Sequence, residues 1–358
     1  MTTQSGSPYW SGFVAGLDPY VPGEQPKDQN LIKLNTNENP YPPSPKVLEV
    51  LRKDTVDLLR LYPDPTSSAL KQVIAKVNHL QSEQVFVGNG SDEVLALAFM
   101  TFFKQGKPLL YPDITYGFYQ AYCKLFDIEV DVIPLADDFS IDFSAYDRPN
   151  GGIIFPNPNA PTSLLKPLSE IEALLKHNTD SVIVVDEAYI DFGGVSAASL
   201  VDTYPNLLVI QTLSKSRSLA GIRVGFALGH AKLIEGMERV KNSFNSYPVD
   251  RMAEASAIAA MNDTAYFNET VAKVIATREW ASEQLKALGY DVLPSKTNFL
   301  FARPSRQEAE FVFKTLREKN IVIRYFQRPR IDGYVRITVG TDAEMQALVN
   351  ALREIDVV

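Results

Sequence analysis

Short, uninterrupted apolar segments alternate with amphipathic ones from about residue 67 onward, and this alternation constrains the fold most strongly. A continuous apolar segment suits a strand buried on both faces, and an amphipathic segment suits a helix that covers it. We expect strands at 84–87, 108–111, 129–133, 152–155, 181–185, 207–211 and 224–228, and helices at 67–79, 91–103, 115–126 and 168–177. This rhythm predicts an α/β fold with a mostly parallel central sheet covered by helices on both faces.

The pattern changes toward the two ends of the chain. A Gly- and Pro-rich arm leads into a short strand at 31–34, and Ser44 with Pro45 should begin a helix that continues to about residue 61. Later we expect helices at 231–242, 249–261 and 264–288, strands at 298–302, 321–325 and 334–339, and a closing helix from 342. The sequence therefore predicts an N-terminal arm that is partly small domain (1–44), a large domain (45–285) and a small α+β domain (286–358).

Composition excludes several classes of protein. The 358 residues, 45% of them apolar, can bury a large core, and the formal net charge is −8. Because the basic residues form no dense run, we expect neither nucleic acid nor a membrane as a partner. The longest apolar stretch, about 94–103, is too short to span a bilayer, and Cys123 is the only cysteine. We therefore expect a soluble cytoplasmic protein without disulfides.

A lysine follows the apolar segment 207–211. Two hydroxyl side chains, Thr212 and Ser214, directly precede Lys215, and Arg223 follows beside glycines. A lone lysine after a strand is more often a solvated surface charge. The functional interpretation of Lys215 therefore depends on the side chains around it. An aldehyde cofactor with a phosphate group needs such a set, because the amine binds the aldehyde and the donors hold the phosphate.

This segment, TLSKSRSLAGIRVGF, resembles the cofactor-lysine signature of pyridoxal-phosphate aminotransferases of fold type I, and specifically of histidinol-phosphate aminotransferases. Similar motifs lie along nearly the whole chain: LNTNENPYPPSP, YPDP, GNGSDE, TYGFY, VDEAYIDF and VRITVG. The resemblance implies pyridoxal 5′-phosphate as the cofactor and a homodimer with shared active sites.

The resemblance also implies a reaction, in which the amino group moves between L-histidinol phosphate and 2-oxoglutarate. Lys215 would hold the cofactor, be displaced by the incoming amine, and then act as general base and acid for a 1,3-proton shift. Two alternatives stay open on the same scaffold. One is an aromatic amino-acid aminotransferase, and the other is a pyridoxal-phosphate decarboxylase that acts on an amino-acid phosphate.

The motif GNGSDE joins an expected strand to an expected helix. Backbone N–H groups of the first helical turn and the Ser91 hydroxyl would therefore face the crevice at the strand end. The alternative is an ordinary helix start, where Asp92 and Glu93 complement the helix dipole. The resemblance makes Gly90, Ser91 and Asp92 the phosphate cup, completed by Thr212, Ser214 and Arg223.

Asp186 ends another apolar segment, at 181–185. A buried carboxylate needs a cation, and a protonated pyridine nitrogen would supply it, although a structural salt bridge is the alternative. The resemblance assigns Tyr189 to the phenolic oxygen of the cofactor and Tyr116 to stacking on its ring. Many relatives bond that oxygen through an asparagine where this chain has Ala160, so Asn159 is the candidate substitute.

Two arginines lie in expected strands of the small domain. Strand arginines are more often solvated, yet both could present guanidinium groups to an oxyanion. By resemblance, Arg336 clamps a carboxylate or phosphate of the substrate, Arg324 assists it, and Tyr20 and Asn39 contact the substrate from the N-terminal segment. Tyr62, in YPDP, would reach the cofactor phosphate of the neighbouring subunit.

Overall fold

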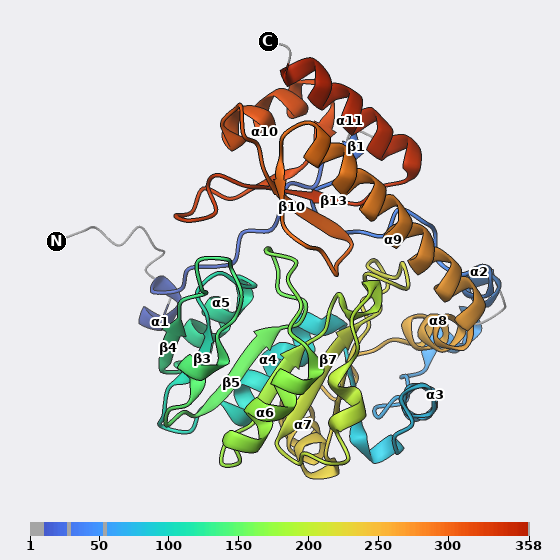
Figure 1. Ribbon diagram of the computed structural model, residues 1–358. Coiled ribbons are helices and arrows are strands. Elements are labelled where there is room, and N and C mark those ends of the chain that lie inside the picture. The colour runs from blue at the N-terminus through green and yellow to red at the C-terminus, as the bar shows by residue number, and fades with distance from the viewer. Residues whose placement is uncertain (1–10, 27–29, 53–55, 357–358) are drawn as a thin grey trace.

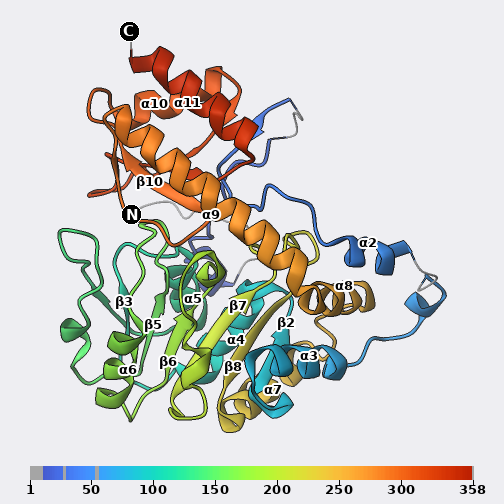
Figure 2. The ribbon, with the colours of Figure 1, turned by 45° about the vertical axis from the view of Figure 1, so that its right-hand side comes forward.

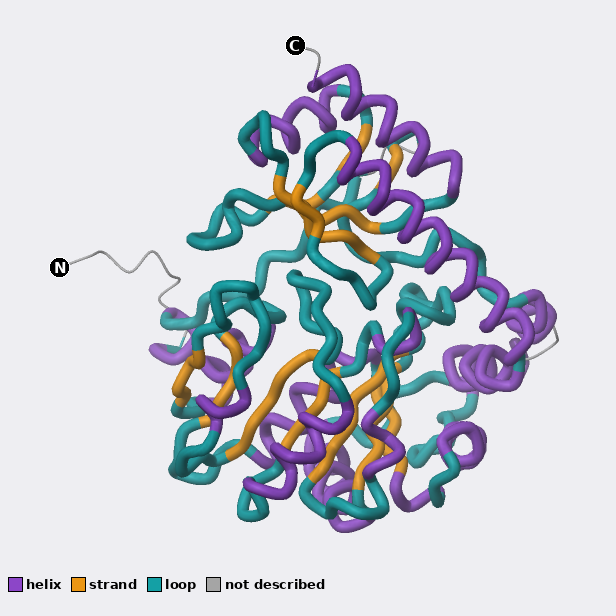
Figure 3. Tube along the Cα trace, in the orientation of Figure 1, coloured by secondary structure: helices purple, strands orange, loops and turns teal. Residues whose placement is uncertain are grey.

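The computed structural model describes residues 11–26, 30–52 and 56–356. Figure 1 shows two lobes, with a seven-stranded sheet in the large lobe and a four-stranded sheet in the small lobe above it. The long helix α9 (Thr264–Ala287) runs from the large lobe into the small lobe in both ribbon views (Figures 1 and 2). Loops at the upper edge of the large sheet face the small lobe (Figure 3).

The seven-stranded sheet has the strand order β2-β8-β7-β6-β5-β3-β4. Its strands are β2 (Val85–Gly88), β3 (Leu109–Pro112), β4 (Val130–Ile133), β5 (Gly152–Pro156), β6 (Ile183–Asp186), β7 (Leu207–Thr212) and β8 (Gly225–Gly229). Only β8 runs antiparallel to its neighbours in this sheet. The predicted mostly parallel sheet is therefore confirmed, and the carboxyl ends of β5, β6 and β7 lie at one edge.

Helices cover both faces of this sheet, as the sequence predicts. Alternate strand residues divide between two buried apolar clusters, with Leu207 and Val209 in one and Leu208 and Ile210 in the other. The first cluster includes residues of α2 (Pro45–Arg52), α3 (Ser68–Asn78), α6 (Leu168–His177) and α8 (Arg251–Asn262). The second includes residues of α4 (Gly90–Phe102), α5 (Phe118–Phe126) and α7 (Ala231–Phe244).

The small lobe combines the two ends of the chain. Its antiparallel sheet has the order β12-β13-β10-β9, from β9 (Asp291–Val292), β10 (Phe299–Arg303), β12 (Arg324–Tyr325) and β13 (Val335–Thr338). Beside it, β1 (Ile32–Lys33) pairs in parallel with β11 (Ile321–Val322). A third apolar cluster joins Leu34 to residues of α10 (Ala309–Glu318) and α11 (Asp342–Asp356). The domain boundaries at 44/45 and 285/286 stay a prediction.

Three expectations about elements are wrong in detail. The single helix expected from Pro45 to about residue 61 is described as two elements, α2 at Pro45–Arg52 and a 3-10 helix at Val56–Arg60. The single strand expected at 321–325 divides into β11 and β12, which belong to different sheets. Helix α5 begins after Tyr116 rather than before it.

The remaining short helices are α1 (Gly12–Ala15), η1 (Val56–Arg60), η2 (Ser82–Gln84), η3 (Phe143–Tyr146), η4 (Ile190–Phe192) and η5 (Ala197–Leu200). In the described part of the chain, no helix combines the length and the apolar character needed to cross a membrane.

Candidate active site

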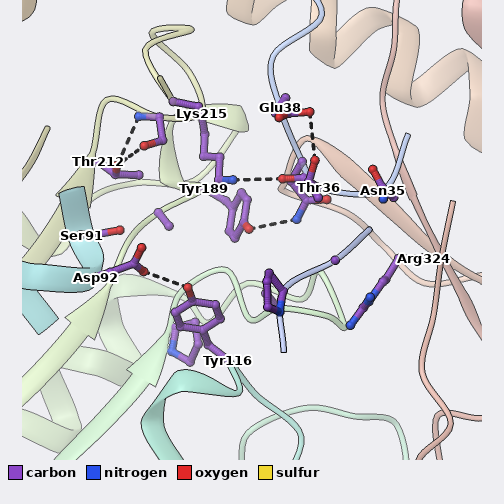
Figure 4. Close-up of a pocket in the computed structure, with 18 of the residues that line it drawn as sticks. Asn35, Thr36, Glu38, Ser91, Asp92, Tyr116, Tyr189, Thr212, Lys215 and Arg324 are labelled. Carbon is purple, nitrogen blue, oxygen red and sulfur yellow. Dashed lines mark hydrogen bonds between the residues drawn. The ribbon is translucent and has the colours of Figure 1, made fainter. Parts of the chain in front are cut away.

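A cavity of about 450 Å³ lies at the carboxyl ends of β6 and β7, and both lobes and the N-terminal arm line it (Figure 4). It brings together most of the side chains that the sequence predicts for the site. These are Tyr20, Ser91, Asp92, Tyr116, Asp186, Tyr189, Thr212, Ser214, Lys215, Arg223, Arg324 and Arg336.

One corner of the cavity is rich in hydrogen-bond donors. Ser91 lies in the first turn of α4, and Thr212 donates to the Ser214 hydroxyl (3.0 Å between the Oγ atoms). The Arg223 guanidinium bonds Asp92, with 3.0 Å between Nη2 and Oδ2. A helix N-terminus, three hydroxyls and a guanidinium therefore converge on one place, which is a suitable environment for a phosphate.

Two glycines make this corner possible. A Cβ added to Gly90, whose φ is +77°, would lie 2.4 Å from Nη2 of Arg223. A Cβ added to Gly225 would lie 2.4 Å from the backbone nitrogen of Ser91. Gly90 therefore leaves room for the guanidinium rather than lining the cavity itself, and Gly225 lets β8 approach the first turn of α4.

Lys215 follows β7 and points across the cavity toward the N-terminal segment (Figure 4). Its Nζ donates to the carbonyl oxygen of Thr36 (3.2 Å) and lies 5.9 Å from the centroid of the Tyr189 ring. Burial, followed by the charge of Arg336, lowers the pKa of Lys215 to about 8, against the opposing charge of Glu38. The amine can therefore lose its proton close to neutral pH, as a nucleophile or base requires.

Asp186 is almost fully buried at the end of β6, with 4% of its surface exposed. Its Oδ2 accepts from the Tyr119 hydroxyl (2.8 Å) and its Oδ1 from the Ala188 backbone N–H (3.2 Å). Among the described residues no lysine or arginine pairs with it, so the structural salt bridge is not found there. Burial raises the pKa of Asp186 to about 6, which indicates a carboxylate that lacks a cation.

Two tyrosines, Tyr189 and Tyr116, also line the cavity. The Tyr189 hydroxyl accepts from the Asn37 amide (2.9 Å between Nδ2 and the hydroxyl oxygen). The Tyr116 hydroxyl donates to Oδ1 of Asp92 (2.9 Å). Both hydroxyls are thus fixed by partners, and both rings line the cavity.

The opposite side of the cavity is cationic. Arg336 donates to the backbone oxygen of Asn35 (2.8 Å from Nη2), while its Nε is buried without a hydrogen-bond partner among the described residues. The Arg324 and Arg336 guanidinium groups lie 5.3 and 5.5 Å from the centroid of the Phe326 ring. Neither arginine pairs with a carboxylate in the described part of the chain. This clamp (Arg324 and Arg336) can therefore receive an anion.

Besides Gly90, three further predicted residues are not among the described residues that line the cavity. Asn39 donates its amide to the backbone oxygens of Lys215 (3.0 Å) and Ser216 (3.3 Å). Asn159 is buried behind the wall, and its amide donates to the Ile114 carbonyl (3.0 Å). Tyr62 is 78% exposed and stacks on Tyr247, with ring centroids 4.8 Å apart. Their predicted contacts with cofactor or substrate stay predictions.

Sequence reasoning missed several residues of the site. Asn35, Thr36, Asn37 and Glu38 line the cavity from the motif NTNENP, where only Asn39 is predicted to act, and Phe326 lines it from the small lobe. Tyr119 lies on α5 three residues after Tyr116, so helical spacing offered a signal for it.

The fold and this site define a class of protein. A family model described as "Aminotransferase class I and II" matches residues 29–352. Among solved structures, the putative histidinol-phosphate aminotransferase of Erwinia carotovora atroseptica superposes with a TM-score of 0.84 at 26% identity, covering 91% of this chain and 96% of that one. The structure of histidinol-phosphate aminotransferase from Sinorhizobium meliloti in complex with pyridoxal-5′-phosphate gives a TM-score of 0.88 at 24% identity, with 98% of each chain covered. At that identity the second likeness shows the fold alone.

Sequence similarity narrows the class. Histidinol-phosphate aminotransferase 2 of Dechloromonas aromatica (strain RCB) is 60% identical over 353 residues, which are 98% of this chain and 99% of that protein. Histidinol-phosphate aminotransferase 1 of Hydrogenovibrio crunogenus is 60% identical over 349 residues, 98% of each. The chain belongs to the class I and II aminotransferases and, within them, to the family of histidinol-phosphate aminotransferases.

Proposed function

We propose that this protein is a histidinol-phosphate aminotransferase of histidine biosynthesis. It moves the amino group between L-histidinol phosphate and 2-oxoglutarate, and so interconverts them with imidazole acetol phosphate and L-glutamate. The observation that carries this function is that one cavity has two separate groups of anion-binding donors, with Lys215 between its walls. One anion site suits the cofactor phosphate, and the other suits the phosphate or carboxylate of the substrate.

The residues present fit pyridoxal 5′-phosphate. The corner formed by Ser91, Thr212, Ser214 and Arg223 would hold its phosphate, and Lys215 would bind its aldehyde. The buried carboxylate of Asp186, which has no cation among the described residues, would take the ring nitrogen.

When bound, the cofactor supplies a conjugated ring that accepts electrons as a bond to the substrate Cα breaks. The chain supplies the proton transfers. The Lys215 amine, whose pKa is lowered to about 8, would take the proton from the substrate Cα and, as a general acid, would deliver it to the carbon of the former aldehyde group. Asp186 would stabilise positive charge on the ring nitrogen, and the Tyr189 hydroxyl would bond the phenolic oxygen.

The two half-reactions place different anions at the same clamp. L-histidinol phosphate carries a phosphate, whereas glutamate carries a carboxylate. The two guanidinium groups of Arg324 and Arg336, with the Tyr20 hydroxyl, offer more donors than one carboxylate needs. An aromatic amino acid would leave part of this clamp unused.

The fold does not separate this function from the decarboxylase alternative. The L-threonine-O-3-phosphate decarboxylase of Porphyromonas gingivalis has a TM-score of 0.76 at 24% identity, covering 91% of this chain and 99% of that one. The relatives at 60% identity favour histidinol phosphate.

A panel of amines assayed with 2-oxoglutarate tests the proposal. We expect glutamate to form with the highest kcat/KM when L-histidinol phosphate is the donor. A preference for phenylalanine would favour an aromatic aminotransferase, and carbon dioxide release without 2-oxoglutarate would favour the decarboxylase. Either result would contradict the proposed function.

The same proposal includes a twofold homodimer. The stacked rings of Tyr62 and Tyr247 are exposed, at 78% and 42%, and Phe244, three residues before Tyr247, is 76% exposed. Arg251 fixes the segment by donating to the Tyr62 carbonyl (2.6 Å from Nη2), so the ring is presented outward. Such a patch suits an interface between subunits. Sedimentation at the assay concentration tests this, and a fully active monomer would contradict it. A cytoplasmic location stays a prediction.

A further inference from the structure

Tyr119 is a buried tyrosine of α5 that contacts a predicted cofactor residue without being one of the described residues lining the cavity. Its hydroxyl donates to Oδ2 of Asp186 (2.8 Å), and the Ala188 backbone N–H donates to Oδ1 (3.2 Å). Both side chains are buried, at 0% and 4% exposure. The two oxygens of the carboxylate are therefore each held by a donor, which fixes its orientation in the wall.

Neighbouring rings hold the Tyr119 ring in place. Its centroid lies 5.9 Å from that of Phe99, 6.2 Å from that of Tyr111 and 5.9 Å from that of Tyr116. The planes of Tyr116 and Tyr119 meet at 89°, an edge-to-face contact. The direction of the Tyr119 hydroxyl is thus set by packing, and the same ring supports Tyr116, which is predicted to stack on the cofactor.

The hydroxyl keeps its proton in this position. Burial, followed by the charge of Asp186, raises the pKa of Tyr119 well above its usual value. The other titratable groups that face Asp186 are Asp92 from α4, Tyr122 from α5 and Tyr189 from the loop after β6. None of these three described groups donates a hydrogen bond to the carboxylate, whereas Tyr119 does. Tyr119 is therefore the side chain that offsets the cost of burying the charge of Asp186.

We propose that Tyr119 is a positioning residue that keeps the Asp186 carboxylate ionised and aimed at the ring nitrogen of the cofactor. The inference rests on the proposed function through the cofactor, and not through the choice of amino donor. Without the hydroxyl, the buried carboxylate takes up a proton at a higher pH and attracts a protonated pyridine less. A hydrogen bond to a charged group corresponds to about a ten- to hundredfold change in affinity.

Tyr119→Phe removes the hydroxyl and retains the ring. Pyridoxamine 5′-phosphate serves as the probe, because it has no aldehyde and cannot bond covalently to Lys215. Its Kd is measured by equilibrium dialysis from pH 5 to 9 on cofactor-free protein. We expect the Kd at neutral pH to rise about ten- to hundredfold, and the loss of affinity on the acid side to begin at a higher pH than in the unaltered protein.

Tyr122→Phe is the matched control, because its hydroxyl lies on the same helix and donates to the Asp92 carbonyl (2.8 Å) instead. We expect the affinity of Tyr122→Phe for pyridoxamine 5′-phosphate to fall at the same acidic pH as that of the unaltered protein. The proposal would be overturned if Tyr119→Phe lost affinity at the same acidic pH as the unaltered protein. It would also be overturned if both variants shifted that pH equally. Failure of the cofactor assignment would look different, because the unaltered protein would then not bind the probe at all, and a different amino donor would show in the panel of amines while leaving probe binding intact.

A measurement on the unaltered protein replaces the variant if Tyr119→Phe does not fold. With tyrosine labelled at Cζ, one NMR signal of the cofactor-free protein should titrate with Asp186, near pH 6. If no tyrosine signal titrates in that range, the proposal is wrong.

Discussion

The two sides of the cavity are built in different ways. The cofactor side uses strand ends and the first turn of α4, so Ser91, Thr212 and Lys215 are placed by one continuous sheet. The substrate side uses long side chains from remote segments. Arg336, for example, is held by the backbone of Asn35, 301 positions away in the sequence.

This difference suggests that the reaction depends on one side of the cavity and the choice of substrate on the other. The large lobe can position the lysine, the phosphate corner and Asp186 from its own sheet. The clamp arginines pair across β12 and β13 within the small lobe, and they face the cavity where that lobe and the arm meet the large sheet. We therefore expect changes on the cofactor side to affect every substrate, and changes on the clamp side to affect some substrates more than others.

The largest effect is expected on the cofactor side, at Lys215. Lys215→Ala should lower turnover with all amino donors by about 10⁴-fold, because it removes both the covalent anchor and the general base. The cofactor absorption that depends on the bond to Lys215 should also disappear. Lys215→Arg keeps the charge and should be equally inactive. Retained turnover together with that absorption would refute the role of this lysine.

The next effect tests the clamp. Arg324→Ala should lower kcat/KM for L-histidinol phosphate about ten- to hundredfold more than for phenylalanine, since a charge-assisted contact contributes about 1.5–3 kcal/mol. Cofactor affinity should not change. Arg303→Ala is the control, because Arg303 lies in the same sheet but pairs with Asp291 (2.9 Å). If Arg324→Ala lowered kcat/KM equally for both donors, the clamp would not determine the choice of substrate as proposed.

A third effect concerns stability. The pKa of Lys215 in the folded protein is about 8, below the ordinary value of about 10.4. Below pH 8 the amine is charged in both states, so the folded state carries the full cost of the buried charge. That cost is relieved as the pH rises toward 10.

Lys215→Met should therefore stabilise the cofactor-free protein by on the order of 3 kcal/mol at pH 7. The gain should shrink between pH 8 and 10. Urea unfolding of both proteins at pH 7 and pH 9.5 measures it. A gain that does not depend on pH would mean that packing, and not the charge, causes the difference.

The smallest effect is expected at Asn39, which connects the N-terminal segment to the backbone after β7. Asn39→Ala should cost about 1 kcal/mol of stability and lower activity a few-fold for every donor, because it removes backbone hydrogen bonds. A loss confined to L-histidinol phosphate would instead support the direct substrate contact that the sequence predicts.

The same contrast explains what the sequence could predict. GNGSDE, VDEAYIDF and TLSK each follow an apolar strand, and parallel strands bring their carboxyl ends to one edge, so these residues could be placed together. Thr36 and Asn37 could not be placed in this way. Their partners, Lys215 and Tyr189, are 179 and 152 positions away, and no local pattern encodes such contacts.

Two assignments show a further limit. Asn159 is in the predicted loop, yet its amide is occupied by the Ile114 carbonyl and the Thr162 hydroxyl, a choice that depends on packing. Tyr62 begins the motif YPDP, and its predicted partner lies in another subunit, so one chain alone contains no information on that contact.

The pairing of β1 with β11 has a consequence for the order in which the protein acquires its parts during synthesis. Ile32 is made early, but its partner Ile321 leaves the ribosome near the end of translation. By then the segment from Gly90 to Arg223, which includes the phosphate corner and Lys215, has long been complete. A nascent chain thus completes the proposed cofactor side of the cavity first, and the proposed substrate side last.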